Sequence, residues 1–325
     1  MKRAAPIDPL RRRLVAGFAC MGASAALLPC CPPRAFAAGD LELTIEPVAD
    51  GVFAFQGVNE LMAPQNRGTI ANLGAIVGED AVAIVDSGGS LVEGEAFLAA
   101  MRQVTQKPIR YLINTHMHPD HIFGNAAFRP TGATVVGHRN LPAALEARAA
   151  FYLHSFREQL GEKLMQGIEI IPPTLLVEDR LDLDLGGRSL ELRAWKAAHT
   201  DNDLTVFDSR TKTLFTGDLV FLQHLPTLDG SLLGWMRQLG ELAAIDASTV
   251  VPGHGPVPSS WPQALAGERR YFEALADDLR KAIKDGVPLG EAVQTAGLAE
   301  RGNWALFDDY NGRNATAAYA ELEWE

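Results

Sequence analysis

The stretch Thr115–Asn125 carries a dense group of side chains that can bind metal. Three histidines and one aspartate fall within six positions, at His116, His118, Asp120 and His121. Imidazole and carboxylate groups are common ligands of zinc and related divalent cations. A single histidine is more often a packed core residue, but packing alone hardly explains four ligand-type residues at this spacing. The stretch therefore predicts a metal site.

The residues around this stretch indicate how its side chains could converge. Residues 109–114 are short, apolar and rich in β-formers, which predicts a buried strand directly before the histidines. While the backbone stays extended, side chains at i and i+2 point the same way, so His116 and His118 can hold one metal. Pro119 suits the first turn of a helix. That turn directs Asp120 and His121 towards a second point nearby.

Three more ligand-type residues lie next to strands predicted later in the chain. They are His199 before the strand 204–207, Asp218 after the strand 213–215, and His254 after the strand 249–252. Each signal is weak alone, since an aspartate after a glycine is usually a turn residue. Together they place three ligands at strand–loop junctions, where functional sites are commonly built.

The order of predicted elements favours one α/β sandwich. Strands are expected at 41–48, 52–55, 70–77, 81–85, 109–114, 134–136, 174–177, 180–185, 189–194, 204–207, 213–215 and 249–252. Helices are expected at 94–104, 141–166, 233–247, 261–284 and 289–295, with Asn314 as the cap of a last helix ending at 322. A turn is expected at 86–89. Because no Pro/Gly-rich linker separates the halves, we expect two packed sheets with helices outside.

The first 37 residues have the composition of a secretory signal peptide. A basic start is followed by the apolar stretch 14–28 and by the small-residue cleavage site Ala35-Phe36-Ala37. The apolar stretch is too short for a membrane span, so no membrane insertion is expected after cleavage. Arg11-Arg12-Arg13 also fits twin-arginine export of a folded protein. We expect a periplasmic or secreted protein.

Cysteine content and charge narrow the function classes. Cys20, Cys30 and Cys31 are the three cysteines, and all lie within the predicted signal. The mature chain therefore has no disulfide and no thiolate nucleophile or ligand. It keeps 23 basic and 39 acidic residues, a net charge of −16. That acidity argues against nucleic-acid binding and leaves a small-molecule substrate as the expected partner.

The complete ligand pattern resembles the metallo-β-lactamase superfamily. The pattern is His116-x-His118-x-Asp120-His121, followed by His199, Asp218 and His254. The resemblance implies an αββα four-layer sandwich over residues 38–260, with a C-terminal helical part, 261–325, packed on the same domain. It also implies a dinuclear site. His116, His118 and His199 would hold the first metal, Asp120, His121 and His254 the second, and Asp218 would bridge them.

A narrower resemblance rests on shorter motifs. The signal, Asn59-Glu60-Leu61, Pro252-Gly253-His254-Gly255 and Arg313-Asn314-Ala315-Thr316 are similar to the quinoprotein relay system zinc metallohydrolases. Those proteins are exported and linked with pyrroloquinoline-quinone alcohol oxidation. The resemblance implies a quinoprotein dehydrogenase system as a partner.

The predicted ligand set implies hydrolytic chemistry. Two cations roughly 3.5–4 Å apart can share a water and lower its pKa from 15.7 towards about 7. With no Ser–His–Asp order and no cysteine, a metal-bridging hydroxide is the expected nucleophile, and Asp120 is the expected catalytic residue that orients it or moves its proton. Two zinc ions are expected because the sequence shows no redox partner, although iron and manganese accept the same ligands. Polar neighbours could orient the imidazoles, although turn-forming roles are equally consistent with them; the candidates are Thr115, Thr200, Asp201 and Asn202.

The expected substrate is an ester, thioester, lactone or related carbonyl compound. Phe221 stands where zinc β-lactamases of one subclass carry the lysine that grips a lactam carboxylate, which argues against efficient lactam hydrolysis. Candidate pocket residues follow the ligand loops or lie near the chain end, and packing roles are equally consistent with them; they are Phe221, His224, Asp229, Tyr310 and Arg313. Two alternatives stay open: an iron-dependent oxygenase on the same fold, and a metal-binding accessory factor of a quinoprotein dehydrogenase.

Overall fold

The short β-rich segments assemble into two sheets. The computed structural model describes residues 41–325, so the predicted signal and the three cysteines lie outside the described residues. The first sheet has the strand order β1 (Glu46–Ala49), β2 (Val52–Phe55), β3 (Leu73–Val77), β4 (Val82–Val85), β5 (Ile109–Ile113), β6 (Thr134–His138) and β7 (Leu175–Val177). The second has the order β13 (Ser259–Ser260), β12 (Thr249–His254), β11 (Thr213–Phe221), β10 (Leu204–Asp208), β9 (Ser189–Ala194) and β8 (Arg180–Asp184).

The helices lie between and after these strands. Those of the first half are α1 (Leu91–Val104), α2 (Pro119–Ile122), the 3₁₀ turn η3 (Asn125–Thr131), α3 (Leu141–Leu160) and α4 (Glu162–Met165). Those of the second half are α5 (Leu232–Ala243), α6 (Leu265–Lys284), α7 (Leu289–Thr295), the 3₁₀ turn η4 (Leu298–Asn303) and α8 (Phe307–Leu322). Within residues 41–325, no helix is both long and apolar enough to cross a bilayer.

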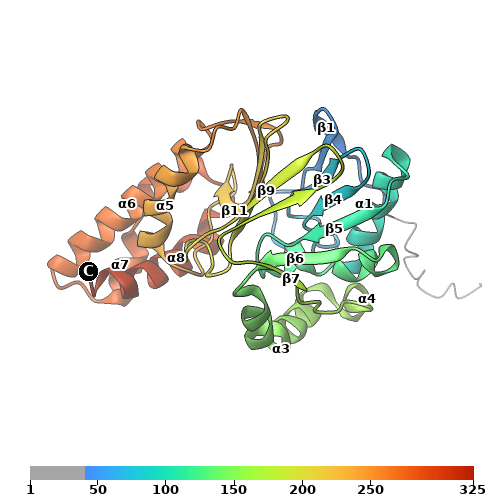
Figure 1. The fold of residues 1–325 in the computed structure, drawn as a ribbon. Coiled ribbons are helices and arrows are strands. Elements are labelled where there is room, and N and C mark those ends of the chain that lie inside the picture. The colour runs from blue at the N-terminus through green and yellow to red at the C-terminus, as the bar shows by residue number, and fades with distance from the viewer. Residues whose placement is uncertain (1–40) are drawn as a thin grey trace, which may run out of the picture. The chain divides into compact units, whose positions relative to one another are not determined.

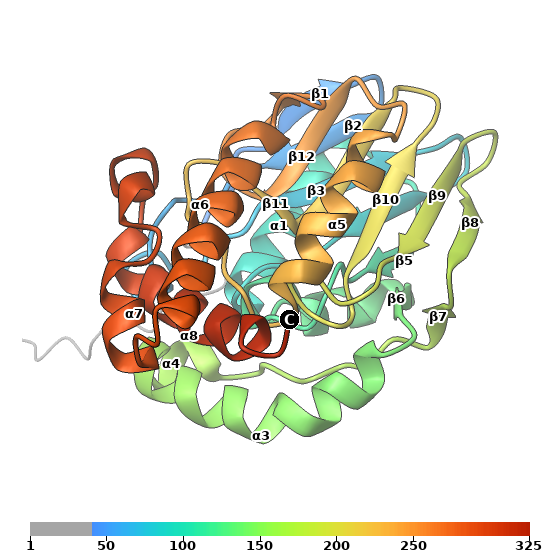
Figure 2. The same cartoon turned by 90° about the vertical axis from the view of Figure 1, so that its left-hand side faces the viewer.

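Alternation along the strands divides the core into layers. On β4, Ala83 and Val85 face the second sheet, whereas Val82 and Ile84 face α1 and η3. On β12, Val251 packs between the sheets and Val250 packs under α5, α6 and α8. The two sheets thus lie face to face, with helices on both outer faces (Figures 1 and 2). This arrangement confirms the predicted αββα sandwich.

Strand direction brings distant segments of sequence to one edge. β4, β5 and β6 run parallel, and so do β11 and β12. Asn72 ties the two sheets together there: its N–H donates to the Gly253 carbonyl at 2.8 Å, and its Nδ2 donates to the carbonyls of Pro252 and Gly255 at 2.9 and 3.0 Å. A Cβ at Gly253 would lie 1.9 Å from Oδ1 of Asp218, so glycine is required at this crossing.

Several predicted boundaries are wrong. β11 extends to Phe221, because pairing with β12 continues through two register shifts, so Asp218 lies inside the strand rather than after it. α3 ends at Leu160, where Gly161 has a φ of 81°. α8 begins at Phe307, so Asn314 is not its cap. It is a buried residue within the helix that bonds to the loop 226–228.

Glu268 is a buried acid on α6, behind β11. Its side chain is fully buried; Oε1 accepts a hydrogen bond from the Phe221 N–H at 3.3 Å, while Oε2 has no partner among the described residues. Burial raises the pKa of Glu268 well above its ordinary value, and Asp218 adds to the rise despite the opposing hydrogen bond from Phe221. The fold therefore favours the neutral acid.

We expect Glu268→Gln to become more stable relative to the native chain as pH rises. The unfolded glutamate ionises above about pH 4.3 and the folded one only at higher pH, so the stability that this group contributes is lost as pH rises. The difference in free energy of unfolding should grow by at most about 1.4 kcal/mol per pH unit. Urea unfolding at pH 5, 6 and 7 measures it. Exposed Glu273→Gln is the control, and a pH-independent difference for Glu268→Gln would contradict the assignment.

Candidate metal centre

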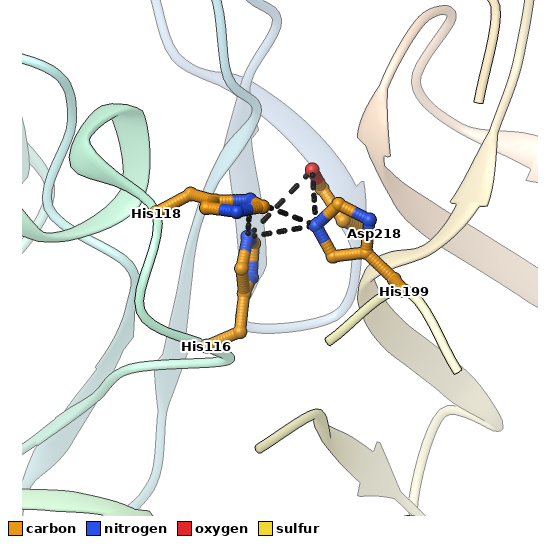
Figure 3. Close-up of side chains that lie close together, drawn as sticks. All are labelled: His116, His118, His199 and Asp218. Atoms are coloured by element: carbon orange, nitrogen blue, oxygen red, sulfur yellow. Dashed lines mark hydrogen bonds and ion pairs between the residues drawn. The ribbon is translucent and has the colours of Figure 1, made fainter. Parts of the chain in front are cut away.

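Three imidazoles from two parts of the chain meet at the sheet edge. His116 and His118 follow β5, and His199 precedes β10 (Figure 3). Nε2 of His116 lies 3.1 Å from Nδ1 of His118 and 3.2 Å from Nε2 of His199. Nδ1 of His118 and Nε2 of His199 lie 2.9 Å apart. Three ring nitrogens thus form a triangle around one point.

The other nitrogen of each ring is held by a hydrogen-bond acceptor. Nδ1 of His199 donates to the carbonyl of Thr227 at 2.6 Å. Nε2 of His118 lies 3.2 Å from Oδ2 of Asp229. Nδ1 of His116 lies 3.1 Å from Oγ1 of Thr115, whose own proton goes to a carboxylate. These partners fix the tautomers, so the nitrogens at the triangle carry lone pairs.

A second cluster lies beside the first. The carboxylate Oδ2 of Asp120 lies 3.6 Å from Nε2 of His121 and 3.2 Å from Nε2 of His254. Nδ1 of His121 donates to Oδ2 of Asp86 at 2.8 Å, and Nδ1 of His254 donates to the carbonyl of Ile70 at 2.9 Å. Both Nε2 atoms are therefore directed at the cluster.

Asp218 lies between the two clusters and contacts both. Its Oδ2 is 3.7 Å from Nε2 of His116, 3.4 Å from Nε2 of His199 and 3.5 Å from Nε2 of His254. Its Oδ1 is 3.1 Å from Nε2 of His121. Oδ2 thus lies between the two clusters and Oδ1 faces the second, so this one carboxylate contacts ligands of both, as a bridging ligand does.

The ligand-atom spacing fits divalent metal ions. A tetrahedral ion with bonds of about 2.1 Å holds neighbouring ligand atoms roughly 3.4 Å apart, and the separations here run from 2.9 to 3.7 Å. The seven side chains fall into two groups: His116, His118, His199 and Asp218, and Asp120, His121 and His254. Unprotonated nitrogens so close repel one another unless a cation lies between them. The His/Asp cluster therefore indicates divalent metal ions.

The electrostatics of the cluster show the same need for positive charge. Burial lowers the pKa of His199 to about 3, which keeps its lone pair free. Burial would also lower the pKa of His254, but Asp218 and Asp120 outweigh it and raise that pKa to about 9. In the absence of metal, a proton on the His254 ring partly balances the negative charges of Asp120 and Asp218. Bound cations would replace this proton.

A cavity of about 290 Å³ opens onto the cluster. All five predicted pocket residues line it: Phe221, His224, Asp229, Tyr310 and Arg313. Nδ1 of His224 donates to the Leu225 carbonyl at 2.7 Å. The proton of the neutral ring is therefore on Nδ1, and Nε2 is free to accept a hydrogen bond. Sequence reasoning missed the α3 side of the wall, which supplies Arg148, Phe151, Tyr152, Ser155, Phe156 and Gln159.

The residues that orient the rings were predicted only in part. Thr115 contacts an imidazole as expected. Thr200 and Asn202 take the turn-forming alternative. The Thr200 N–H donates to the Asp203 carboxylate at 2.9 Å, and Nδ2 of Asn202 donates to Asp201 at 2.8 Å. Those residues close the turn after His199. The missed residue is Asp86, which follows β4 and reads in sequence as a turn residue.

We expect Asp86→Asn to weaken metal binding about 10- to 100-fold. Asp86 has a φ of 60°, which asparagine tolerates, and its carboxylate accepts from both Thr115 and His121. The amide keeps one acceptor and loses the charge that orients the imidazole. Competition with a chromogenic chelator measures the affinity, with exposed Asp182→Asn as the control. Equal affinities for the two variants would show that Asp86 does not support the site.

Comparison with known proteins agrees with this geometry. One relative is the linear primary-alkylsulfatase of Pseudomonas sp. (strain ATCC 19151), 24% identical over 226 residues, which are 59% of this chain and 41% of the relative. Another is the beta-lactamase-like protein 2 homolog of Caenorhabditis elegans, 25% identical over 177 residues, 54% of this chain and 52% of the relative. The chain thus spans about half the length of these curated relatives or less.

Solved structures and a family model identify the fold and the family. The metallo-beta-lactamase from Pontibacter korlensis superposes with a TM-score of 0.58 at 19% identity, over 71% of this chain and 99% of that one. The model of the metallo-beta-lactamase superfamily matches residues 66–254, which include all seven side chains of the cluster. The chain belongs to the metallo-beta-lactamase superfamily.

Proposed function

We propose that the protein is an exported dinuclear zinc hydrolase that cleaves an ester, thioester, lactone or related carbonyl bond. The observation that carries the proposal is the orientation of five imidazoles. Each has one nitrogen bound to an acceptor and the other directed at a point beside Asp218. Such pre-set ligands bind cations without rearrangement, and the superfamily membership supports metal-dependent hydrolysis.

Two zinc ions held there would lower the pKa of a shared water and polarise the scissile carbonyl. The protein's own contribution is to position the reactants. Asp120 has a side chain 14% exposed, against 3% for Asp218, so it is the carboxylate ligand that the cavity reaches. Burial opposes its ionisation, yet His121 and His254 hold the pKa of Asp120 below its usual range. Asp120 is therefore a charged acceptor that orients the attacking water.

The cavity wall suits an organic body on the substrate. Apolar groups from the loop before β3 and from α3 face the polar cluster, among them Met62, Ile70 and Phe156. One relative is named an alkylsulfatase, so a test panel should include an alkyl sulfate beside an ester, a thioester, a lactone and a lactam. Hydrolysis of the sulfate alone would redirect the proposal from carbonyl to sulfate esters.

We expect His116→Ala combined with His118→Ala to abolish hydrolysis. The pair supplies two of the three nitrogens in the first cluster, and losing several kcal/mol of transition-state stabilisation corresponds to at least about a thousandfold in kcat/KM. The panel measures activity, and elemental analysis measures bound metal. Exposed His154→Ala is the control. Full activity in the double variant would reject the metal-dependent mechanism.

The proposal includes export and a link to quinoprotein alcohol oxidation. Its support is the composition of residues 1–37 and the motifs around Asn59, His254 and Arg313. The competing proposal is that the protein is a metal-binding accessory factor of a quinoprotein dehydrogenase rather than a hydrolase. Dehydrogenase activity in a strain that lacks the protein distinguishes these two roles. If the purified protein turns over substrate and dehydrogenase activity is unchanged in that strain, the accessory role fails.

We expect Arg11→Lys combined with Arg12→Lys to retain most of the precursor inside the cell, because twin-arginine export reads the paired arginines. Cell fractionation followed by immunoblotting measures the distribution. Arg3→Lys, outside the pair, should be exported normally. Normal export of the double variant would exclude the twin-arginine route.

A further inference from the structure

The cavity beside the metal centre contains a cationic side chain that has no ion-pair partner among the described residues. Arg313 lies on α8, is exposed and lines the cavity. Within residues 41–325, no side chain or carbonyl forms a hydrogen bond or ion pair with its guanidinium. The i,i+4 neighbour Asp309 makes no ion pair with it either. An arginine left free at a cavity wall is suited to an anionic group of a ligand.

The other charged residues of the cavity wall contact protein partners or face the metal cluster. Arg148 of α3 contacts Oδ1 of Asp229 at 3.3 Å, and the same carboxylate supports His118 through Oδ2. Asp120 and Asp218 face the metal cluster. Arg313 is therefore the one charged residue of this lining without a protein partner in the described part of the chain.

A second, independent feature points to a ligand at the same place. Tyr152 on α3 is 4% exposed and lines the cavity, and its hydroxyl has no hydrogen-bond partner among the described residues. Burying a hydroxyl without a hydrogen-bond partner destabilises the fold, and a ligand acceptor would relieve this cost. Burial raises the pKa of this phenol, and the charges that act on it include Arg148 and Arg313. The phenol thus stays protonated and can donate.

α3 and α8 bring these groups to the wall of one cavity. Figure 2 shows α3 running below α8, and the lining includes Tyr152 and Phe156 from α3 and Tyr310 and Arg313 from α8. Aromatic rings connect α8 with the metal cluster: the ring of Tyr310 lies 5.4 Å from that of His224, which lies 4.9 Å from that of His254. The net charge of the chain does not oppose an anion here, because exposed charges further than about 8 Å are largely screened at physiological ionic strength.

We propose that Arg313 and the hydroxyl of Tyr152 form an anion-binding subsite, so that the substrate carries a carboxylate, sulfate or phosphate group on an apolar body, apart from the scissile bond. The inference rests on the proposed hydrolase function and names its substrate class. In this arrangement the metal centre acts on one end of the substrate while Arg313 holds the other.

A matched pair of substrates tests the subsite. Mono-4-nitrophenyl succinate carries a terminal carboxylate, and 4-nitrophenyl butyrate is its neutral analogue of equal acyl length. The measured quantity is the ratio of their kcat/KM values. Arg313→Gln should lower this ratio at least fivefold, as expected for a charge-assisted contact that is partly exposed to solvent. Tyr152→Phe should lower it at least twofold, and Arg313→Lys should keep part of it.

Arg269→Gln is the matched control, since Arg269 is exposed on α6, makes the same change of charge and does not line the cavity. It should leave the ratio unchanged. A fall smaller than fivefold for Arg313→Gln relative to this control, or no fall for Tyr152→Phe, would overturn the subsite. Hydrolysis of both esters with an unchanged ratio would overturn the subsite and leave the hydrolase function intact.

A binding measurement decides the question even if neither ester is cleaved. Calorimetry with 4-phenylbutanoate and with neutral 4-phenylbutan-1-ol, on zinc-loaded and metal-free protein, separates the arginine from the metals as the source of anion affinity. The subsite predicts that Arg313→Gln weakens only the carboxylate, at least fivefold, in both metal states. A carboxylate affinity that depends on zinc alone would assign anion binding to the metals and overturn the proposal.

Discussion

The structure depends on one electrostatic constraint: Asp218 is a buried carboxylate inside a strand, with four imidazoles within 3.7 Å of its oxygens. Burying a charge without compensation costs far more than a folded domain can spare, so positive charge must lie beside it. Protonated rings supply that charge in part, and two metal ions would supply it fully. The backbone is adapted to this need. β11 shifts register twice around Asp218, and glycine at 253 leaves space for its oxygen.

The surrounding elements act mainly to orient the rings. His199 depends on the carbonyl of Thr227, and the loop that carries Thr227 is bonded at Leu228 and Pro226 to Asn314 of α8. The C-terminal helices therefore belong to the site as much as to the core. The same loop and α8, facing α3, form the walls of the cavity. One region of the fold thus sets both metal binding and the room available for a substrate.

Much of this was predictable from local sequence signals, and the rest depended on long-range contacts. The spacing from His116 to His121 indicates ligands because a strand followed by a helical turn has only a few geometries. Strand alternation predicted the layers. The length of β11 was not predictable, since Thr216-Gly217-Asp218 reads as a turn and is held extended only by β12. The acceptors of His199 and His254 are backbone carbonyls, which leave no signature in side-chain sequence.

Anomalous X-ray diffraction of zinc-loaded crystals at the zinc edge tests the central claim most directly. Two peaks should lie on either side of the Asp218 carboxylate, one beside His116, His118 and His199, the other beside Asp120, His121 and His254. The absence of anomalous density from this cluster in protein that hydrolyses substrate would contradict the claim that these seven side chains form a dinuclear catalytic centre.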